Sequence, residues 1–243
     1  MRKHRTSNTM VIQLKFGLVI GLILATILWL TSCSSDDKFI IRTGGGAVDI
    51  DGNEYQTVVI GDQEWFAENL MVTRNNDHTG IDGFSNLDSW YSTNSPGYCY
   101  YNNNAGFKES YGLLYNWYAA SSGKACPTGW HVPTSNEWQK LINNLGGVSS
   151  AGGKMKEEGF EHWIEPNEGA TNESLFTALP GGYNYPTPKS YGNMGQNGFW
   201  WTSTEISDSK AYSVLMSYQN SNAGLNTEYF KQQGLSIRCV KNK

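Results

Sequence analysis

Cysteine and histidine are the residue types in this chain with the widest chemical repertoire, and each occurs four times. One cysteine follows an apolar run near the N-terminus, and the other three stand at positions 99, 126 and 239. The separations among these three, 27 and 113 residues, fit no zinc-binding or thioredoxin-like pattern. A Cys–His pair that used Cys99 would need a nearby positive charge to lower the thiol pKa, and its immediate neighbours are tyrosines. We therefore predict no catalytic residue, no metal and no cofactor, and a protein that is not an enzyme.

The three histidines beyond the first ten residues lie in different sequence contexts. His131 lies inside a Gly-Trp-His-Val-Pro-Thr string, where we expect its side chain to order a loop by hydrogen bonding. His78 and His162 lie in polar, loop-like segments, and we expect both to be solvated.

Two acidic motifs resemble parts of calcium sites. Residues 49–54 read Asp-Ile-Asp-Gly-Asn-Glu, but the glutamate that closes a calcium loop is missing at the proper distance, so the pattern predicts a turn. Residues 165–167 read Glu-Pro-Asn, the tripeptide with which mannose-type C-type lectins hold calcium and sugar hydroxyls. Those lectins also need a Trp-Asn-Asp triplet in a following strand, and residues 200–203 read Trp-Trp-Thr-Ser instead. Half of the lectin calcium site is therefore absent, and the sequence Glu-Pro-Asn is also common in ordinary turns.

The first 33 residues have the form of an export signal. Four basic residues and no acidic residue precede an apolar run over residues 16–30. Fifteen residues at about 1.5 Å each span roughly 22 Å, less than the ~30 Å hydrocarbon core of a membrane, which favours a cleaved signal. Leu30-Thr31-Ser32-Cys33 resembles the lipobox of bacterial lipoproteins, which implies cleavage before Cys33 and acylation of its thiolate with palmitate-type chains. Such chains would hold the protein on a membrane. The alternative is an uncleaved anchor.

The segment after Cys33 predicts a tether. Ser34-Ser35-Asp36-Asp37-Lys38 resembles the short acidic signal that sends some lipoproteins to the outer face of the outer membrane. We therefore expect cell-surface exposure, with a periplasm-facing location as the alternative. Glycines at positions 44–46 make the segment flexible. The predicted organisation is a signal peptide at 1–32, a tether at 33–46 and one domain at 47–243.

Composition limits the classes of partner. Without residues 1–32 the chain has 14 basic and 22 acidic residues, a net charge of −8, which argues against nucleic acid as a partner. Eight of the nine tryptophans remain in this part, enough aromatic area to order a loop-rich domain.

Periodicity predicts several elements. Residues 55–60 and 63–66 predict a β-hairpin around the Gly61-Asp62 turn. Thr134, with Glu137 three positions later, predicts a capped helix whose apolar stripe includes Trp138 and Leu141, and a second helix is expected at 151–157. Strands are expected at 98–101, 176–179, 199–204, 211–217 and 235–240, a buried aromatic segment at 111–120, and no regular structure at 74–98. Short helices beside a loop-rich antiparallel sheet make an α+β fold.

A series of short motifs, in order, resembles the Fibrobacter succinogenes major paralogous domain. They include Ala67-Glu68-Asn69-Leu70, residues 111–118, the Cys126-Pro127-Thr128-Gly129-Trp130-His131 string, residues 178–182, residues 198–201 and Ile237-Arg238-Cys239-Val240. The resemblance implies a C-type-lectin-like α+β fold with two short helices and a Cys126–Cys239 disulfide. Closing that loop would stabilise by about 4–5 kcal/mol in the chain-entropy model. Cys99 is then an unpaired thiol, which we expect to behave as a small buried hydrophobe.

Members of the family are exported, often as lipoproteins, and have no agreed biochemical activity. We therefore expect a non-catalytic binding or adhesion module for a glycan or a surface protein, with a structural envelope component as the alternative. Exposed aromatics would form its contact face, and the same residues could instead be core. The candidates are Trp90, Tyr91, Trp163, Tyr183, Tyr185 and Tyr191.

Overall fold

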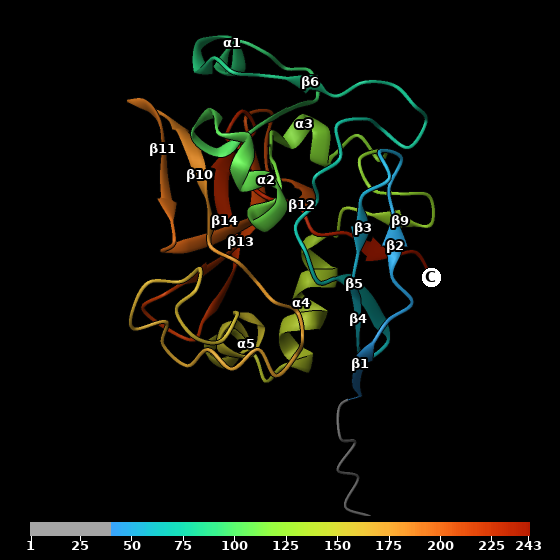
Figure 1. Ribbon diagram of the computed structural model, residues 1–243, viewed down its shortest axis with the longest axis vertical. Coiled ribbons are helices and arrows are strands. Elements are labelled where there is room, and N and C mark those ends of the chain that lie inside the picture. Colours follow the sequence, from blue (N-terminus) through green and yellow to red (C-terminus); the bar gives the residue numbers. More distant parts are fainter. Residues whose placement is uncertain (1–39) are drawn as a thin grey trace, which may run out of the picture. The chain divides into compact units, whose positions relative to one another are not determined.

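The computed structural model describes residues 40–243, and the side chain of Asn226 is not described (Figure 1). The predicted signal peptide and Cys33 lie outside these residues. The described chain is a sheet-rich mixture of strands and helices, in agreement with the expected α+β class. Among residues 40–243, no helix is long and apolar enough to cross a membrane.

One sheet contains both ends of the described chain. Its strand order is β1 (Ile41–Thr43), β4 (Thr57–Ile60), β5 (Gln63–Phe66), β15 (Val240–Lys241) and β9 (Trp130–His131). The β4–β5 hairpin confirms the prediction from the Gly61-Asp62 turn.

The predicted tether extends too far. Strand β1 pairs with β4, Gly44 donates its backbone N–H to the Thr57 carbonyl (2.7 Å), and Gly46 donates to Thr57 Oγ1 (2.9 Å). Strand β2 (Ala47–Val48) then pairs with β3 (Glu54–Tyr55). Backbone hydrogen bonds therefore bring residues 41–46 into the domain, although their glycines suggested a flexible linker.

Helix α4 (Ser135–Asn144) is the longest helix that the structure describes, and it confirms the capping prediction. The Thr134 hydroxyl accepts from the Glu137 backbone N–H, while the Glu137 carboxylate accepts from the Thr134 N–H, so both members of the capping box are present. Its buried stripe of Trp138, Leu141 and Ile142 belongs to one core cluster with residues of β4, β5, β12 and β13. Figure 1 shows α4 beside β4 and β5. Helix α5 (Val148–Met155) begins three residues before the predicted helix and ends two residues before its end.

The expectation of two short helices is wrong. The described residues also contain α1 (Leu87–Tyr91), α2 (Lys108–Tyr111) and α3 (Trp117–Ala120), with 3-10 turns at Tyr101–Asn103 and Ala105–Phe107. Each of these helices is about one turn long, too short to produce a visible periodicity. Helix α1 lies inside the segment for which we expected no regular structure, and Asn86 caps it.

The C-terminal third forms a three-stranded antiparallel sheet and a hairpin. Strands β12 (Asn197–Glu205) and β13 (Lys210–Ser217) confirm two predicted strands, whereas β14 (Ala223–Phe230) was not predicted. The hairpin of β10 (Gly181–Pro186) and β11 (Lys189–Met194), at the edge of the molecule in Figure 1, was not predicted either. Smaller strands β6 (Asp82–Gly83), β7 (Gly97–Cys99) and β8 (Leu114–Tyr115) complete the sheets.

Two of the predicted strands are wrong in whole or in part. Residues 176–179 form only an isolated bridge between Ala178 and Lys156, and of residues 235–240 only Val240 belongs to a strand. In both segments, side chains and single bridges bind the backbone in place of a ladder. These residues are apolar because they are buried, and their sequence therefore resembles that of a strand although most of them form none. Within residues 111–120, most of the aromatic segment is buried, as predicted.

Candidate functional site

The β10–β11 hairpin carries three of the six candidate contact aromatics. Tyr183 lies opposite Gly192, Asn184 opposite Tyr191, and Tyr185 opposite Ser190. Because side chains alternate along a strand, Tyr183 and Tyr185 share one face, and Tyr191 lies on the other face with Asn184. We call Tyr183 and Tyr185 the hairpin tyrosine pair.

Both residues of the hairpin tyrosine pair are half-buried. The two ring centroids are 5.3 Å apart, and Tyr183 also packs on Phe199 (4.8 Å) and Tyr229 (5.9 Å) of the neighbouring sheet. Tyr185 lies close over Gly192, where an added Cβ would meet its ring at 2.8 Å. Sequence reasoning missed Tyr229, because strand β14 was not predicted. The result is a row of amphipathic rings, held on one side by the sheet.

The opposite face of the hairpin is closed by a polar network. Tyr91 donates its hydroxyl to Asn184 Oδ1 (2.7 Å), and the same oxygen accepts the Gly234 backbone N–H (2.6 Å). The Asn184 amide lies 3.5 Å from the Cys99 sulfur, and burial, followed by the proximity of Cys99, raises the pKa of Tyr191. The six candidates therefore do not form one contact face, since Tyr91 and Tyr191 belong to this network.

Cys99 is a free, buried cysteine, as we expected. Burial raises its pKa to about 12, in spite of hydrogen bonds from Tyr191 and Asn184 that act to lower it. A thiol with this pKa is a poor nucleophile at neutral pH.

Trp90 and Trp163 are core residues, and their prediction as contact aromatics is wrong. Trp90 donates its indole N–H to the Gln232 carbonyl, and Trp163 donates to the Ala178 carbonyl at 2.9 Å. Both are almost fully buried. The Lys156 ammonium lies 5.3 Å from the Trp163 ring and donates to the carbonyls of Glu168, Ser217 and Asn220, at 2.9–3.0 Å. All three N–H groups of this lysine thus bind backbone, which makes it a structural clamp for surrounding loops.

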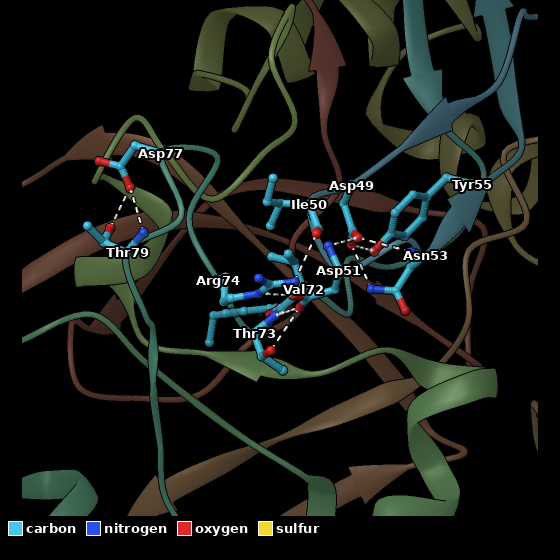
Figure 2. Close-up of polar contacts among 11 residues, drawn as sticks. Asp49, Ile50, Asp51, Asn53, Tyr55, Val72, Thr73, Arg74, Asp77 and Thr79 are labelled. Atoms are coloured by element: carbon cyan, nitrogen blue, oxygen red, sulfur yellow. Dashed lines mark hydrogen bonds and ion pairs between the residues drawn. The ribbon is translucent and has the colours of Figure 1, made fainter.

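Residues 49–54 form a turn, as predicted, and its two aspartates accept hydrogen bonds from other residues of the domain (Figure 2). Asp49 accepts hydrogen bonds from the backbone N–H groups of Asp51 and Asn53, and from the Tyr55 hydroxyl at 2.7 Å. Asp51 accepts from Thr73 and from Arg74 Nε (2.6 Å). Although partial burial acts to raise it, these bonds hold the pKa of Asp51 below its usual value. The turn is thereby fixed to the loop at 72–74.

The tripeptide at 165–167 also binds its own loop. The Asn167 side chain is buried and donates to the carbonyls of Glu157 (2.9 Å) and Gly159 (2.8 Å), whereas Glu165 is exposed. His162 lies in the same loop and is half-buried, with Nδ1 2.8 Å from Glu157 Oε1, so the expectation that it is solvated is wrong. With exposed Glu161, these two residues place their ligating atoms within 4.8 Å of one another. One imidazole and two carboxylates would suit zinc better than calcium.

His131 orders a loop by hydrogen bonding, as predicted. Its Nε2 lies 2.8 Å from Glu137 Oε1, and its Nδ1 lies 2.6 Å from Asn242 Oδ1. It therefore joins the capping box of α4 to the C-terminal strand. His78 is exposed.

The disulfide that the family resemblance implies is present in the structure. Cys126 and Cys239 are joined by an S–S bond of 2.04 Å, with their Cα atoms 6.0 Å apart. The bond links the loop that leads into β9 and α4 to the segment just before β15.

The order of these features along the chain agrees with one known family. A profile of the Fibrobacter succinogenes major domain matches residues 58–241. The chain belongs to this family. No curated protein and no solved structure matches it.

The matched part of this major domain contains the hairpin tyrosine pair, Cys99, the disulfide and the His131–Glu137 contact. Strand β1 and the acidic turn at residues 49–54 precede it, yet they pair with elements inside it. In the described domain, burial or hydrogen bonds within the domain thus hold Cys99, His131 and His162.

Proposed function

We propose that this major domain protein is a cell-envelope lipoprotein that displays a non-catalytic, C-type-lectin-like binding or adhesion module. The ligand is a glycan or a surface protein. The lipid on Cys33 holds the module on the outer membrane, facing the cell exterior.

The hairpin tyrosine pair is the observation that carries this proposal. Tyrosine offers an apolar ring and a hydroxyl with little conformational entropy to lose, which is why binding surfaces are rich in it. Tyr183 and Tyr185 are clustered and partly exposed, and the sheet below them holds the ring of Tyr183 in place. Sugar rings and protein side chains both pack well against such a surface.

The alternative of a purely structural role draws support from the burial of Trp90 and Trp163. Those two indoles fill the core, whereas the hairpin tyrosine pair fills it only in part. A structural component needs no open aromatic face.

A binding screen tests the proposal. Residues 34–243 would be screened against glycans and surface proteins, with the variant Tyr185→Ala and with Tyr218→Ala, a half-buried tyrosine outside the hairpin, as the matched control. We expect a ligand whose binding is lost in Tyr185→Ala and kept in Tyr218→Ala. Binding that is unchanged in both variants would place the contact face elsewhere.

The anchor is tested separately, because it depends on other residues. Mass spectrometry of the mature N-terminus should find an acylated Cys33, and Cys33→Ala should abolish acylation. An intact Met1 or an unmodified Cys33 would refute the anchor and leave the binding proposal standing.

A further inference from the structure

A pocket of about 280 Å³ opens between the first sheet and the loop at residues 172–179. Gln56, Ala67 and Glu68 line it on the sheet side, Ser110 comes from α2, and Leu175 and Thr177 come from the loop. We call it the Glu68 pocket. It shares no residue with the hairpin tyrosine pair.

A buried arginine holds the two walls of the Glu68 pocket together. Arg238 Nε donates to Asn69 Oδ1 (2.8 Å), and its terminal nitrogens donate to the carbonyls of Phe66 (3.0 Å), Phe176 (2.6 Å) and Thr177 (2.8 Å). The guanidinium also lies 4.5 Å from the centre of the Phe176 ring. Because these bonds reach both the sheet segment and the loop, the pocket is formed before any ligand arrives.

Glu68 offers an acceptor that the protein does not use. Its Oε2 is buried and has no hydrogen-bond partner among residues 40–243. Burial raises the pKa of this carboxyl, although Arg238 acts to lower it. A buried polar atom without a partner is costly, and such atoms commonly mark the place of a missing donor.

The loop side of the pocket is strained. Leu175 has φ = 58° and Thr177 has φ = 51°, left-handed conformations that are unfavourable for bulky or β-branched residues. The Asn172 side chain enforces the second of them, because it bonds both the backbone N–H (2.8 Å) and the hydroxyl (3.0 Å) of Thr177. Leu175 is also 45% exposed. An exposed leucine in a strained conformation lowers the stability of the domain without ligand. Its position at the rim of a pocket suggests that it contacts a ligand there.

We propose that the Glu68 pocket binds a neutral, hydroxyl-bearing ligand of the size of one sugar unit. The volume is close to the lower limit for small-molecule sites, so it suits a single ring. Glu68 is half-buried in the pocket wall, so a rotation of its carboxyl group brings the unpartnered Oε2 to a ligand hydroxyl, which donates to it. The apolar face of the ring packs on Leu175 and Leu179, with Gln56 and Ser110 as further polar partners. Glu68 repels an anion, and buried Arg238 already supplies the positive charge beside this carboxyl.

Saturation-transfer NMR on residues 34–243 tests this inference. The probes are the methyl glycosides of glucose, galactose, mannose and N-acetylglucosamine at millimolar concentration, with n-butylammonium as a cationic probe. At least one glycoside should receive saturation from the protein, and its dissociation constant should rise about tenfold or more in Glu68→Met, which removes the acceptor. Glu173→Gln, an exposed change in the same loop, should leave binding unchanged.

Leu175→Asn provides a variant that does not depend on the stability of Glu68→Met. Asparagine tolerates the left-handed conformation, so this variant should melt roughly 2–4 °C higher than the wild type while binding the glycoside more weakly. A purely structural Leu175 would change stability without changing binding. No transfer to any glycoside, binding that both variants retain, or stronger transfer to n-butylammonium would each overturn the inference. The hairpin variant Tyr185→Ala should leave this binding intact, which separates the two sites.

Discussion

Tryptophans in the core and tyrosines on the β10–β11 hairpin are both large aromatic residues, but they differ in burial and in their hydrogen-bond partners. The indole N–H groups of Trp117, Trp163 and Trp201 donate to backbone carbonyls at 2.8–2.9 Å, of Thr202, Ala178 and Tyr115 respectively. Two of these contacts join residues more than 80 positions apart in the chain. Tyr185, by contrast, accepts a hydrogen bond from Ser190 of its own hairpin (3.3 Å) and is only half-buried. The tryptophans fasten segments that are distant in the chain to one another, whereas the hairpin tyrosine pair makes part of the surface.

This difference shows how a domain with so many loops holds its shape. A loop offers few ladder hydrogen bonds, so its backbone carbonyls need other donors. The buried indole of Trp163 supplies one such donor, to the Ala178 carbonyl, together with a large apolar area. Removing a core tryptophan should therefore disturb folding, whereas removing a hairpin tyrosine should disturb recognition.

The largest effect is expected for Trp163→Ala. The change removes a buried ring, the donor to the Ala178 carbonyl and the surface beside Lys156, and should cost about 3–5 kcal/mol of unfolding free energy. Tyr185→Ala should cost less than about 1 kcal/mol, because its ring is only half-buried. Urea denaturation of both variants measures the contrast, and equal costs would contradict the division between the two aromatic sets.

The second-largest loss of stability is expected from removing the disulfide. Cys126→Ser and Cys239→Ser should each lower the unfolding free energy by about 2–5 kcal/mol, since either change frees a loop of 113 residues in the unfolded chain. The double variant should be no worse than either single one. Cys99→Ser should cost less, because it alters only a buried thiol. Thermal and urea denaturation measure these costs, and non-reducing peptide mapping checks the pairing; a native disulfide peptide that contained Cys99 would show that the pairing is wrong.

Local chemistry explains which elements the sequence predicted. The β4–β5 hairpin and the start of α4 depend on neighbouring residues, namely the Gly61-Asp62 turn and the Thr134–Glu137 capping box. Helices of one turn, such as α1, carry no periodic signal, and the 235–240 segment is apolar because it is buried, not because it forms a strand.

Long-range contacts explain what could not be predicted about the site. The two faces of the β10–β11 hairpin differ only because one packs on Phe199 and Tyr229 and the other on Tyr91 and Asn184. Nothing near Trp163 in sequence indicates that the Ala178 carbonyl and the Lys156 side chain will enclose it. The unpartnered oxygen of Glu68 is likewise a property of the folded chain.

A smaller effect is expected from pH, through the His131–Glu137 contact that closes the loop before α4. The Glu137 hydrogen bond raises the pKa of His131, in spite of partial burial. Protonated His131 therefore adds stability at pH values below its unfolded pKa of about 6.5, and this stability is lost as the pH rises through the folded pKa. Partial burial acts to raise the pKa of Glu137, but bonds from His131 and Thr134 lower it to about 2. Its contribution is present above the unfolded pKa and is lost as the pH falls toward 2.

The His131 contribution can be isolated by comparing stability at pH 5.5 and pH 7.5, because the higher value stays below the pKa of about 8 to which burial lowers Lys156. Because both side chains are partly exposed, we expect a loss of only about 0.5–1 kcal/mol from the lower to the higher pH. His131→Gln should remove this difference and keep a hydrogen-bonding side chain. The same pH dependence in Tyr185→Ala and in the wild type would show that it belongs to the loop before α4 and not to the hairpin.

We expect calcium to have no effect on stability. This prediction tests whether recognition depends on polar groups as well as on the hairpin tyrosine pair. The carboxylates of Asp49 and Asp51 already accept hydrogen bonds from protein donors, and Asn167 turns its amide hydrogens toward its own loop. Calcium would have to displace the donors on Asp49 and Asp51, and at the tripeptide the exposed Glu165 carboxylate and the buried Asn167 Oδ1 fall far short of six to eight oxygen ligands. Millimolar calcium should thus leave the melting temperature of residues 34–243 unchanged, and magnesium at the same concentration provides the ionic-strength control. If calcium alone raised the melting temperature by several degrees, and Glu165→Gln abolished that rise, the tripeptide would be a metal site, and recognition would depend on its oxygens as well as on tyrosine rings.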